Sequence, residues 1–305
     1  MGLWHRGYPE QARRALDEGI RDARESVHRR ALAYSLIYKG LTATSARWVA
    51  ETEEAADGLV SHTREHGFAL FFGYGLLLQG GALTLRGQGE AAVEQIHEAV
   101  AATHATGIRR YDPMVLGFLA EALALKGLVA EGLRTLTAAL AAAEVSGTHW
   151  ADAELHRLRG GLLGRLPAND WTEVETCFRT ALSIAREQGT RGFELRAALS
   201  LAGLLNEQGR RDEALELLVP VYGCFTEGFD TPVAFRAITI YWGALTRRAE
   251  NLQCAASPSN APGIPNQSLA SRQFARRSRC YPDRMGAAQF GVLRMQTCSC
   301  YACLG

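Results

Sequence analysis

Two interleaved series of glycines recur along the chain at one period, and they limit the possible folds more than any other feature. Members of the first series are 40, 40 and 42 residues apart: Gly67, Gly107, Gly147 and Gly189. The second series comprises Gly7, Gly87, Gly127 and Gly209, with Arg47 and Asn169 standing where it lacks glycine. Glycine ends helices because it adopts the left-handed conformation at little cost. Two series at one period therefore predict two helices per repeat.

Residues at fixed offsets from these glycines support the same period. A column of small residues consists of Gly80, Ala120, Gly160 and Ala202, and a column of leucines consists of Leu83, Leu123, Leu163 and Leu205. Small residues allow neighbouring helix backbones to approach closely, and leucines fill the groove beside them. No segment shows sustained alternation of apolar and polar residues, so we predict no strands.

The turns and columns together predict the helices. The first helix of each pair is expected at 28–45, 68–86, 108–126, 148–165 and 190–208, and the second at 9–26, 49–66, 89–106, 129–146, 170–188 and 211–228. Pro9 and Asp170 stand where helices are expected to start. One helix pair cannot bury its apolar face alone, so the pairs must stack. We predict an all-α fold, an α-solenoid of about five to six helix pairs with a 40–42-residue period.

Composition changes after the last repeat, and this change sets the expected domains. We assign residues 1–232 to the solenoid, 233–250 to a divergent apolar segment that could form a terminal helix, and 251–305 to a disordered tail. The tail is rich in Arg, Cys, Pro and Ser, and its only acid is Asp283. Its composition is typical of a frame change or a fusion. With no polar helix to close the stack, we expect both ends to be uncapped.

Bulk properties limit the classes of partner. The formal net charge of the 305-residue chain is +1, which gives no sign of a nucleic-acid or membrane partner. No apolar stretch is long enough to span a bilayer, and the first residues lack the apolar core of a signal peptide. We expect a cytoplasmic protein that needs no cofactor or metal.

Three stretches resemble a known class of repeat. They are Gly7-Tyr8-Pro9-Glu10-Gln11-Ala12, Ala153-Glu154-Leu155-His156-Arg157-Leu158-Arg159-Gly160, and the segment from Val221 to Pro232. Together with the Glu-Ala pairs early in second helices, they resemble the tetratricopeptide-type C-terminal region of large bacterial signalling proteins. Those proteins carry a class III nucleotide cyclase or DNA-binding domain and an AAA-type or STAND-type ATPase before the repeats. The period is longer than in ordinary tetratricopeptide repeats, and the consensus Trp and Tyr are missing.

The resemblance implies a binding function and no catalysis. The ATPase needs a Gly-x-x-x-x-Gly-Lys-Ser/Thr loop, and neither Lys39 nor Lys126 lies in one. We therefore expect a noncatalytic protein–protein interaction module, or the regulatory arm of a bacterial signalling ATPase or cyclase. The alternative is a fragment of such a regulator that acts with domains supplied in trans. A third hypothesis is a nucleic-acid-associated regulator that uses the basic segment Arg272–Arg279.

Seven residues form the candidate binding site. The resemblance implies that first helices line the inner groove, where acids recur in one column. The candidates are Asp112, Asp152, Glu154, His156, Arg159, Glu194 and Arg196. The functional interpretation is a groove that receives a basic or polar peptide. The alternative is ordinary solvation of helix N-terminal turns, which favour acids. Catalysis by these carboxylates would need a substrate pocket, for which the sequence shows no sign.

Two further groups have the residue types of a metal site. His62 and His66 are one helical turn apart, a spacing compatible with zinc or with a solvated helix face. Cys298, Cys300 and Cys303 form a thiol cluster to which Cys280 could add a fourth ligand. For this cluster we favour an unstructured tail over a zinc site.

Overall fold

The structure is a computed structural model, and it describes residues 1–231 apart from 27, 110 and 230. The chain divides into two units, Met1–Arg248 and Ala249–Gly305, and every described residue belongs to the first unit. The segment 233–250, the tail 251–305, its thiol cluster and its basic segment therefore lie outside the described residues.

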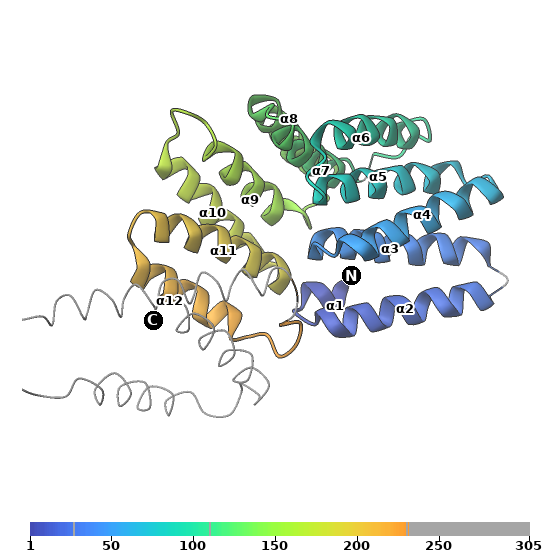
Figure 1. The fold of residues 1–305 in the computed structure, drawn as a ribbon, viewed down its shortest axis with the longest axis horizontal. Helices are drawn as coiled ribbons and strands as arrows, with labels where there is room; N and C mark the ends of the chain where they lie inside the picture. Colours follow the sequence, from blue (N-terminus) through green and yellow to red (C-terminus); the bar gives the residue numbers. More distant parts are fainter. Residues whose placement is uncertain (27, 110, 230, 232–305) are drawn as a thin grey trace, which may run out of the picture. The chain divides into compact units, whose positions relative to one another are not determined.

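The described part of the chain is all-α and consists of twelve helices without strands (Figure 1). Their bounds are α1 Gly2–His5, α2 Pro9–Glu25, α3 Arg29–Ala46, α4 Val49–His66, α5 Ala69–Leu85, α6 Gly89–His104, α7 Asp112–Leu125, α8 Val129–Ser146, α9 Asp152–Leu163, α10 Trp171–Glu187, α11 Arg191–Glu207 and α12 Arg211–Tyr222. Consecutive helices pack as antiparallel neighbours in a solenoid-like order. The predicted fold class is confirmed.

The turns confirm the two glycine series and explain one of their gaps. All eight glycines of the two series have positive φ, from 63° at Gly147 to 91° at Gly7. Arg47 fills a gap with φ 65°, and it is the one non-glycine residue with positive φ in the described chain. Asn169 does not have positive φ, because α9 ends earlier, at Leu163. The Asn169 amide donates a hydrogen bond to the carbonyl of the next residue, Gly164, at 3.0 Å.

Helix ends differ from the prediction at three places. Helix α7 begins at Asp112 rather than at 108, because Pro113 stands in its first turn, where a missing N–H is tolerated. Helix α9 likewise begins at Asp152 rather than at 148. Helix α12 contains Pro220 and ends at Tyr222 instead of 228. The residues freed by this early end form a loop, 223–231.

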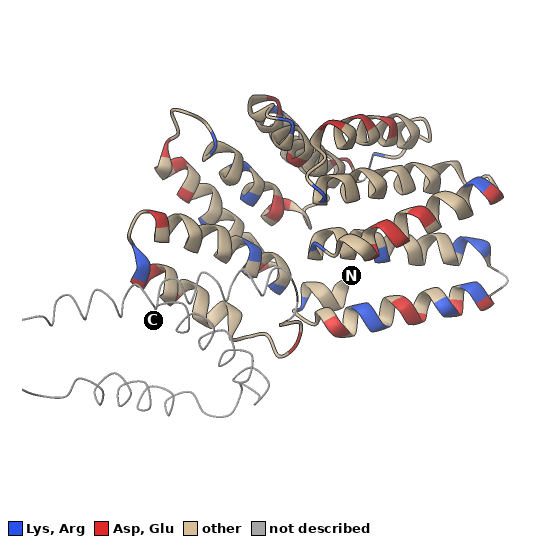
Figure 2. Cartoon of the chain, viewed as in Figure 1, with Lys and Arg blue, Asp and Glu red and all other residues tan. Residues whose placement is uncertain are grey.

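The two kinds of helix have different neighbours. Successive first helices (α3, α5, α7, α9 and α11) contact one another, whereas second helices pack mainly on their sequence neighbours. The first helices therefore lie on the inner side of the stack, and we call their shared surface the inner face. Charged side chains are most frequent on the second helices α2 and α4, whereas α5 carries none (Figure 2).

The small-residue column packs helices closely, as predicted. Ala120 and Ala202 are fully buried. A Cβ atom placed on Gly80 would lie 2.5 Å from Ile96 Cγ1, and one on Gly160 would lie 2.7 Å from Phe178 Cε1. Neither distance is available to a real side chain, so these glycines allow each first helix to approach its partner.

This packing gives a prediction with an internal control. Replacing Gly160 with leucine should lower the free energy of unfolding by about 1–3 kcal/mol relative to Gly161→Leu, because only the first substitution overpacks. A Cβ atom on Gly161 meets nothing within 4 Å, and both changes have the same effect on helix propensity. Urea unfolding of both variants measures the difference, and equal midpoints would contradict the assigned packing.

The first and last helix pairs touch, contrary to the expectation that both ends are uncapped. We call this the end contact. The Trp4 ring packs edge-on against Phe193 of α11, with centroids 5.3 Å apart. The backbone N–H and side chain of Gln11 donate to Glu227 at 3.0 and 3.1 Å, and the Gly228 N–H donates to Glu10 at 2.9 Å. The loop 223–231 and Trp4 therefore join residues more than 180 positions apart in the sequence.

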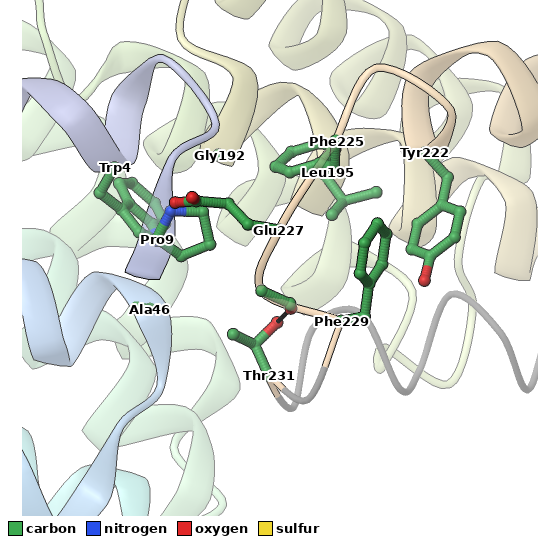
Figure 3. A pocket seen from close by; sticks show the side chains of 11 residues that line it. Trp4, Pro9, Ala46, Gly192, Leu195, Tyr222, Phe225, Glu227, Phe229 and Thr231 are labelled. Carbon is green, nitrogen blue, oxygen red and sulfur yellow. Dashed lines mark hydrogen bonds between the residues drawn. The ribbon is translucent and has the colours of Figure 1, made fainter. Parts of the chain in front are cut away.

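A small cavity of about 30 Å³ lies at the end contact (Figure 3). Its wall is largely apolar and includes Trp4, Pro9, Leu195, Phe225 and Phe229. The Tyr222 hydroxyl is buried and has no hydrogen-bond partner among the described residues. Burial raises the pKa of this phenol to about 12. The cavity has room for about one water molecule, so we regard it as a packing gap.

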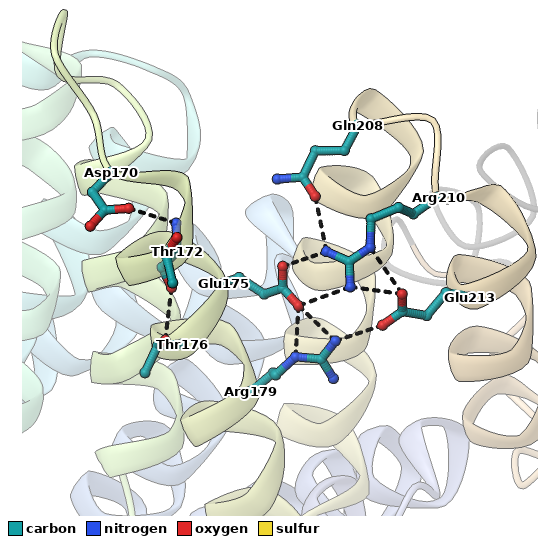
Figure 4. Close-up of polar contacts among 8 residues, drawn as sticks. All are labelled: Asp170, Thr172, Glu175, Thr176, Arg179, Gln208, Arg210 and Glu213. Atoms are coloured by element: carbon teal, nitrogen blue, oxygen red, sulfur yellow. Dashed lines mark hydrogen bonds and ion pairs between the residues drawn. The ribbon is translucent and has the colours of Figure 1, made fainter.

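A polar cluster on the outer side joins α10 to α12 (Figure 4). Arg210 bonds both Glu175 and Glu213, and Arg179 bonds the same two carboxylates. Replacing Arg210 with alanine should lower the thermal midpoint only slightly, because exposed ion pairs are screened by water and salt. Repeating the melt at high salt should remove the difference from the parent, and a large salt-independent loss would contradict this view.

Among the described helices, none combines the length and apolar character needed to cross a bilayer.

Candidate functional site

A charged pocket lies on the inner face, and we call it the inner pocket. It is formed by α3, α7, α9 and α11, is partly open to solvent and has a volume of about 30 Å³, so that, like the end-contact cavity, it has room for about one water molecule and a larger ligand meets only its rim. The charged residues that line it are Arg47, Glu121, Glu154 and Arg196, and the apolar ones include Met114, Phe118, Trp150, Leu158 and Phe193. The wall therefore combines ions with large apolar side chains.

The ions form one connected cluster. The Glu154 carboxylate is bound by the Nε and Nη2 atoms of Arg157 at 2.9 and 2.6 Å, and by Nη2 of Arg196 at 2.8 Å. Arg196 also donates from Nη1 to the Ser45 carbonyl at 2.8 Å, which ties α11 to the end of α3. Arg47, in the turn after α3, pairs with Glu121 of α7. Residues from four helices thus hold one another in place.

The cluster strongly favours the ionised carboxylate. Burial alone would raise the pKa of Glu154, but the adjacent Arg157 and Arg196 outweigh burial and lower the pKa to about 2. Glu154 in turn raises the pKa of Arg157 against the effect of burial. Burial lowers the pKa of Arg196 to about 9, and repulsion from Arg157 and Arg47 adds to burial while Glu154 opposes it. Three guanidinium groups share two carboxylates, so negative charge is in short supply.

The first helices also carry tyrosines at the positions that correspond to the pocket residues. Tyr34, Tyr74, Met114, Glu154 and Arg196 occupy the same position in five successive first helices. One turn later, Tyr38 occupies the position of the pocket residues Phe118 and Leu158. The exposed fractions of Tyr34 and Tyr38 are 51% and 45%.

Ring contacts connect the helices along this surface. The Tyr34 ring lies 4.9 Å from Phe71, and the Tyr74 ring lies 5.3 Å from Tyr111. On α3 the inner face therefore exposes two tyrosines, whereas Phe71 and Tyr74 of α5 are buried and the ions lie between α7 and α11.

Two of the seven predicted site residues, Glu154 and Arg196, line the inner pocket. The acids of the predicted column are each paired with a nearby base. Asp112 is bound by His104 at 3.0 Å, Asp152 by His149 at 2.9 Å, and Glu194 by Arg186 and Arg191 at 3.0 Å each. Each base lies at the end of the preceding helix, in the turn or in the same helix, so these acids stabilise their own repeat. This geometry favours the alternative of local helix-terminal pairing.

The remaining candidates lie elsewhere on α9. Arg159 points to the α10 side, where its Nη2 atom donates to Glu173 at 3.2 Å. His156 is half-buried, and burial lowers its pKa.

The two histidines with metal-site spacing lie on α4. The rings of His62 and His66 stack edge-on with centroids 4.6 Å apart, and the Nε2 atom of His62 lies 2.7 Å from the Arg29 carbonyl oxygen. No group of three or more metal-binding side chains occurs among the described residues.

Sequence reasoning missed part of the pocket. Glu121 and Trp150 were not identified, Arg47 was noted only as a substitute for glycine, and Arg157 only within a resembling stretch. Extending the period to Tyr34, Tyr74 and Met114 would have shown the column that contains Glu154 and Arg196. The link from Arg196 to Ser45 had no local signal, because it spans 151 residues.

These observations define the class of the protein: an all-helical array of consecutive pairs, consistent with a repeat module. No protein-family model matches the chain. No curated protein matches it either.

Proposed function

We propose that the chain is a noncatalytic protein–protein interaction module that binds a peptide segment of another protein on its inner face. The observation that carries this proposal is the exposure of Tyr34 and Tyr38 on α3 and of Arg47 in the turn that follows it. Tyrosine, tryptophan and arginine dominate the energetics of protein interfaces. The inner face holds these residue types on helices that support one another, so little ordering is needed on binding.

The proposal extends to the type of protein. We propose a regulatory arm of a bacterial signalling ATPase or cyclase, on the basis of the three stretches that resemble such regulators. Two of these stretches, Gly7–Ala12 and 221–231, pack together in the end contact, and the third contains Glu154 of the inner pocket. The contact between the first two stretches supports a shared structural role for them. The alternative, a fragment that acts with catalytic domains in trans, predicts a P-loop ATPase or cyclase encoded next to this chain.

Selection from a displayed library of random peptides tests the binding proposal. We expect enriched peptides to bind the full chain and to lose most of their affinity for Tyr38→Ser. The control is Val145→Ser, which changes a side chain that is 91% exposed on the second helix α8. Peptides that bind both variants as well as the parent would contradict binding on the inner face, as would a selection without enrichment.

A further inference from the structure

We propose that the bound segment carries an acidic side chain, which docks against Arg47 at the mouth of the inner pocket, next to an apolar side chain seated on Phe118. This inference rests on the proposed function, because it specifies the chemistry of the partner at the same surface. The occupant is a peptide segment of another protein, with a Glu or Asp beside an aromatic or aliphatic residue.

Charge is the first support for an acidic occupant. Arg47, Arg157 and Arg196 face only Glu121 and Glu154 in the cluster, which leaves one positive charge without a partner of its own. The pKa of Arg196 is lowered in part by repulsion from the other two arginines. An incoming carboxylate would relieve this repulsion in a place where water screens charges poorly. A basic segment would instead add to it.

Access is the second support. Arg157 and Arg196 are largely covered and committed to Glu154, whereas the side chain of Arg47 is 34% exposed. Arg47 uses Nη2 for Glu121, and its other two nitrogens have no partner among the described residues. The guanidinium group therefore keeps donors for a carboxylate oxygen. Its left-handed backbone, φ 65°, places it in the turn at the edge of the pocket.

The apolar surroundings favour a peptide over other anions. Phe118 and Trp150, which are both partly exposed, line the pocket beside Arg47, and Tyr34 and Tyr38 are exposed earlier on α3. A small carboxylate would leave these side chains uncovered. A nucleic acid would need several phosphates neutralised, and one surplus positive charge supplies little of that. A segment with one acid and one or two apolar side chains matches both halves of the inner face.

Peptides selected on the full chain test the inference from the ligand side. Exchanging the acidic residue of an enriched peptide for its amide should weaken binding about ten-fold, the effect of roughly 1.4 kcal/mol in an ion pair. Because only the peptide is changed, a loss of affinity cannot result from misfolding of the protein. Peptides that depend on Tyr38 but contain no required acid would overturn this inference and leave the proposed function standing.

Protein variants locate the contact. Arg47→Asn suits the left-handed turn, and it should weaken the acidic peptide about ten-fold but not its amide form, while Arg47→Lys should keep most of the affinity. Arg134→Gln on α8 removes the same charge elsewhere and should change nothing. Equal effects of Arg47→Asn and Arg134→Gln would overturn the assignment. Displacement of the peptide by sodium acetate, or binding of a short oligonucleotide that competes with it, would also overturn it.

Discussion

Replacing Glu154 with alanine should lower the free energy of unfolding by about 3–5 kcal/mol, the largest effect that we expect from any single charge. The change leaves Arg157 and Arg196 covered and without the carboxylate that binds both. An uncompensated buried charge costs several kcal/mol, because the protein interior cannot replace water around it. Urea unfolding followed by circular dichroism measures the effect.

The control for this prediction is Glu173→Ala, which removes an exposed carboxylate that pairs with Arg159. Exposed pairs contribute about 0–1 kcal/mol, so this variant should unfold close to the parent. If Glu154→Ala were as stable as Glu173→Ala, the cluster would not hold the inner helices together.

The lowered pKa of Glu154 predicts the pH at which the folded chain loses stability in acid. The pKa of Glu154 in the folded chain is about 2, below its ordinary value of 4.5. A lowered pKa stabilises the folded state above the unfolded-state pKa, and this stability is lost as the pH falls from 4.5 towards 2. The parent should therefore lose stability steeply across this window, whereas Glu154→Ala should lose less.

Replacing Trp4 with alanine should cost about 3–5 kcal/mol, the usual range for a buried aromatic side chain. Trp4 is buried against Phe193. Its ring also packs closely on Gly192, since a Cβ atom on that glycine would lie 2.8 Å from Trp4 Cη2. Loss of the ring should open the end contact, so amide hydrogen exchange should speed up in residues 2–12 and 223–229. Trp171→Ala is the control, because that ring is 45% exposed. Identical exchange in the two variants would show that Trp4 does not join the ends.

The sequence predicted the repeat far better than it predicted the contacts between distant repeats. The positions of most turns follow from glycine at positive φ, which is a property of single residues, whereas the short helix α1 was not predicted. Arg47 shows the limit of this reasoning, because its position in the series indicated a turn but not that its side chain reaches Glu121. The early end of α12 at Tyr222 also departs from the regular period.

The end contact could not be read from the sequence for a different reason. The approach of Gln11 to Glu227 depends on small rotations between successive pairs, which add up along the stack. The total rotation cannot be predicted from any single residue. The acidic column shows a second limit, since the equal spacing of Asp112, Asp152 and Glu194 did not indicate how each acid is paired. Their partners, such as His104 and His149, lie a few residues away and bind each acid locally.

The central claim is that a peptide segment binds on the inner face, and photo-crosslinking tests it most directly. A benzophenone amino acid is placed at Tyr38 on the inner face or at Val145 on α8, and each protein is irradiated with a selected acidic peptide. We predict a covalent adduct at position 38, its suppression by excess unlabelled peptide, and no adduct at position 145. An adduct at position 145 alone, or equal adducts at both positions, would contradict binding on the inner face.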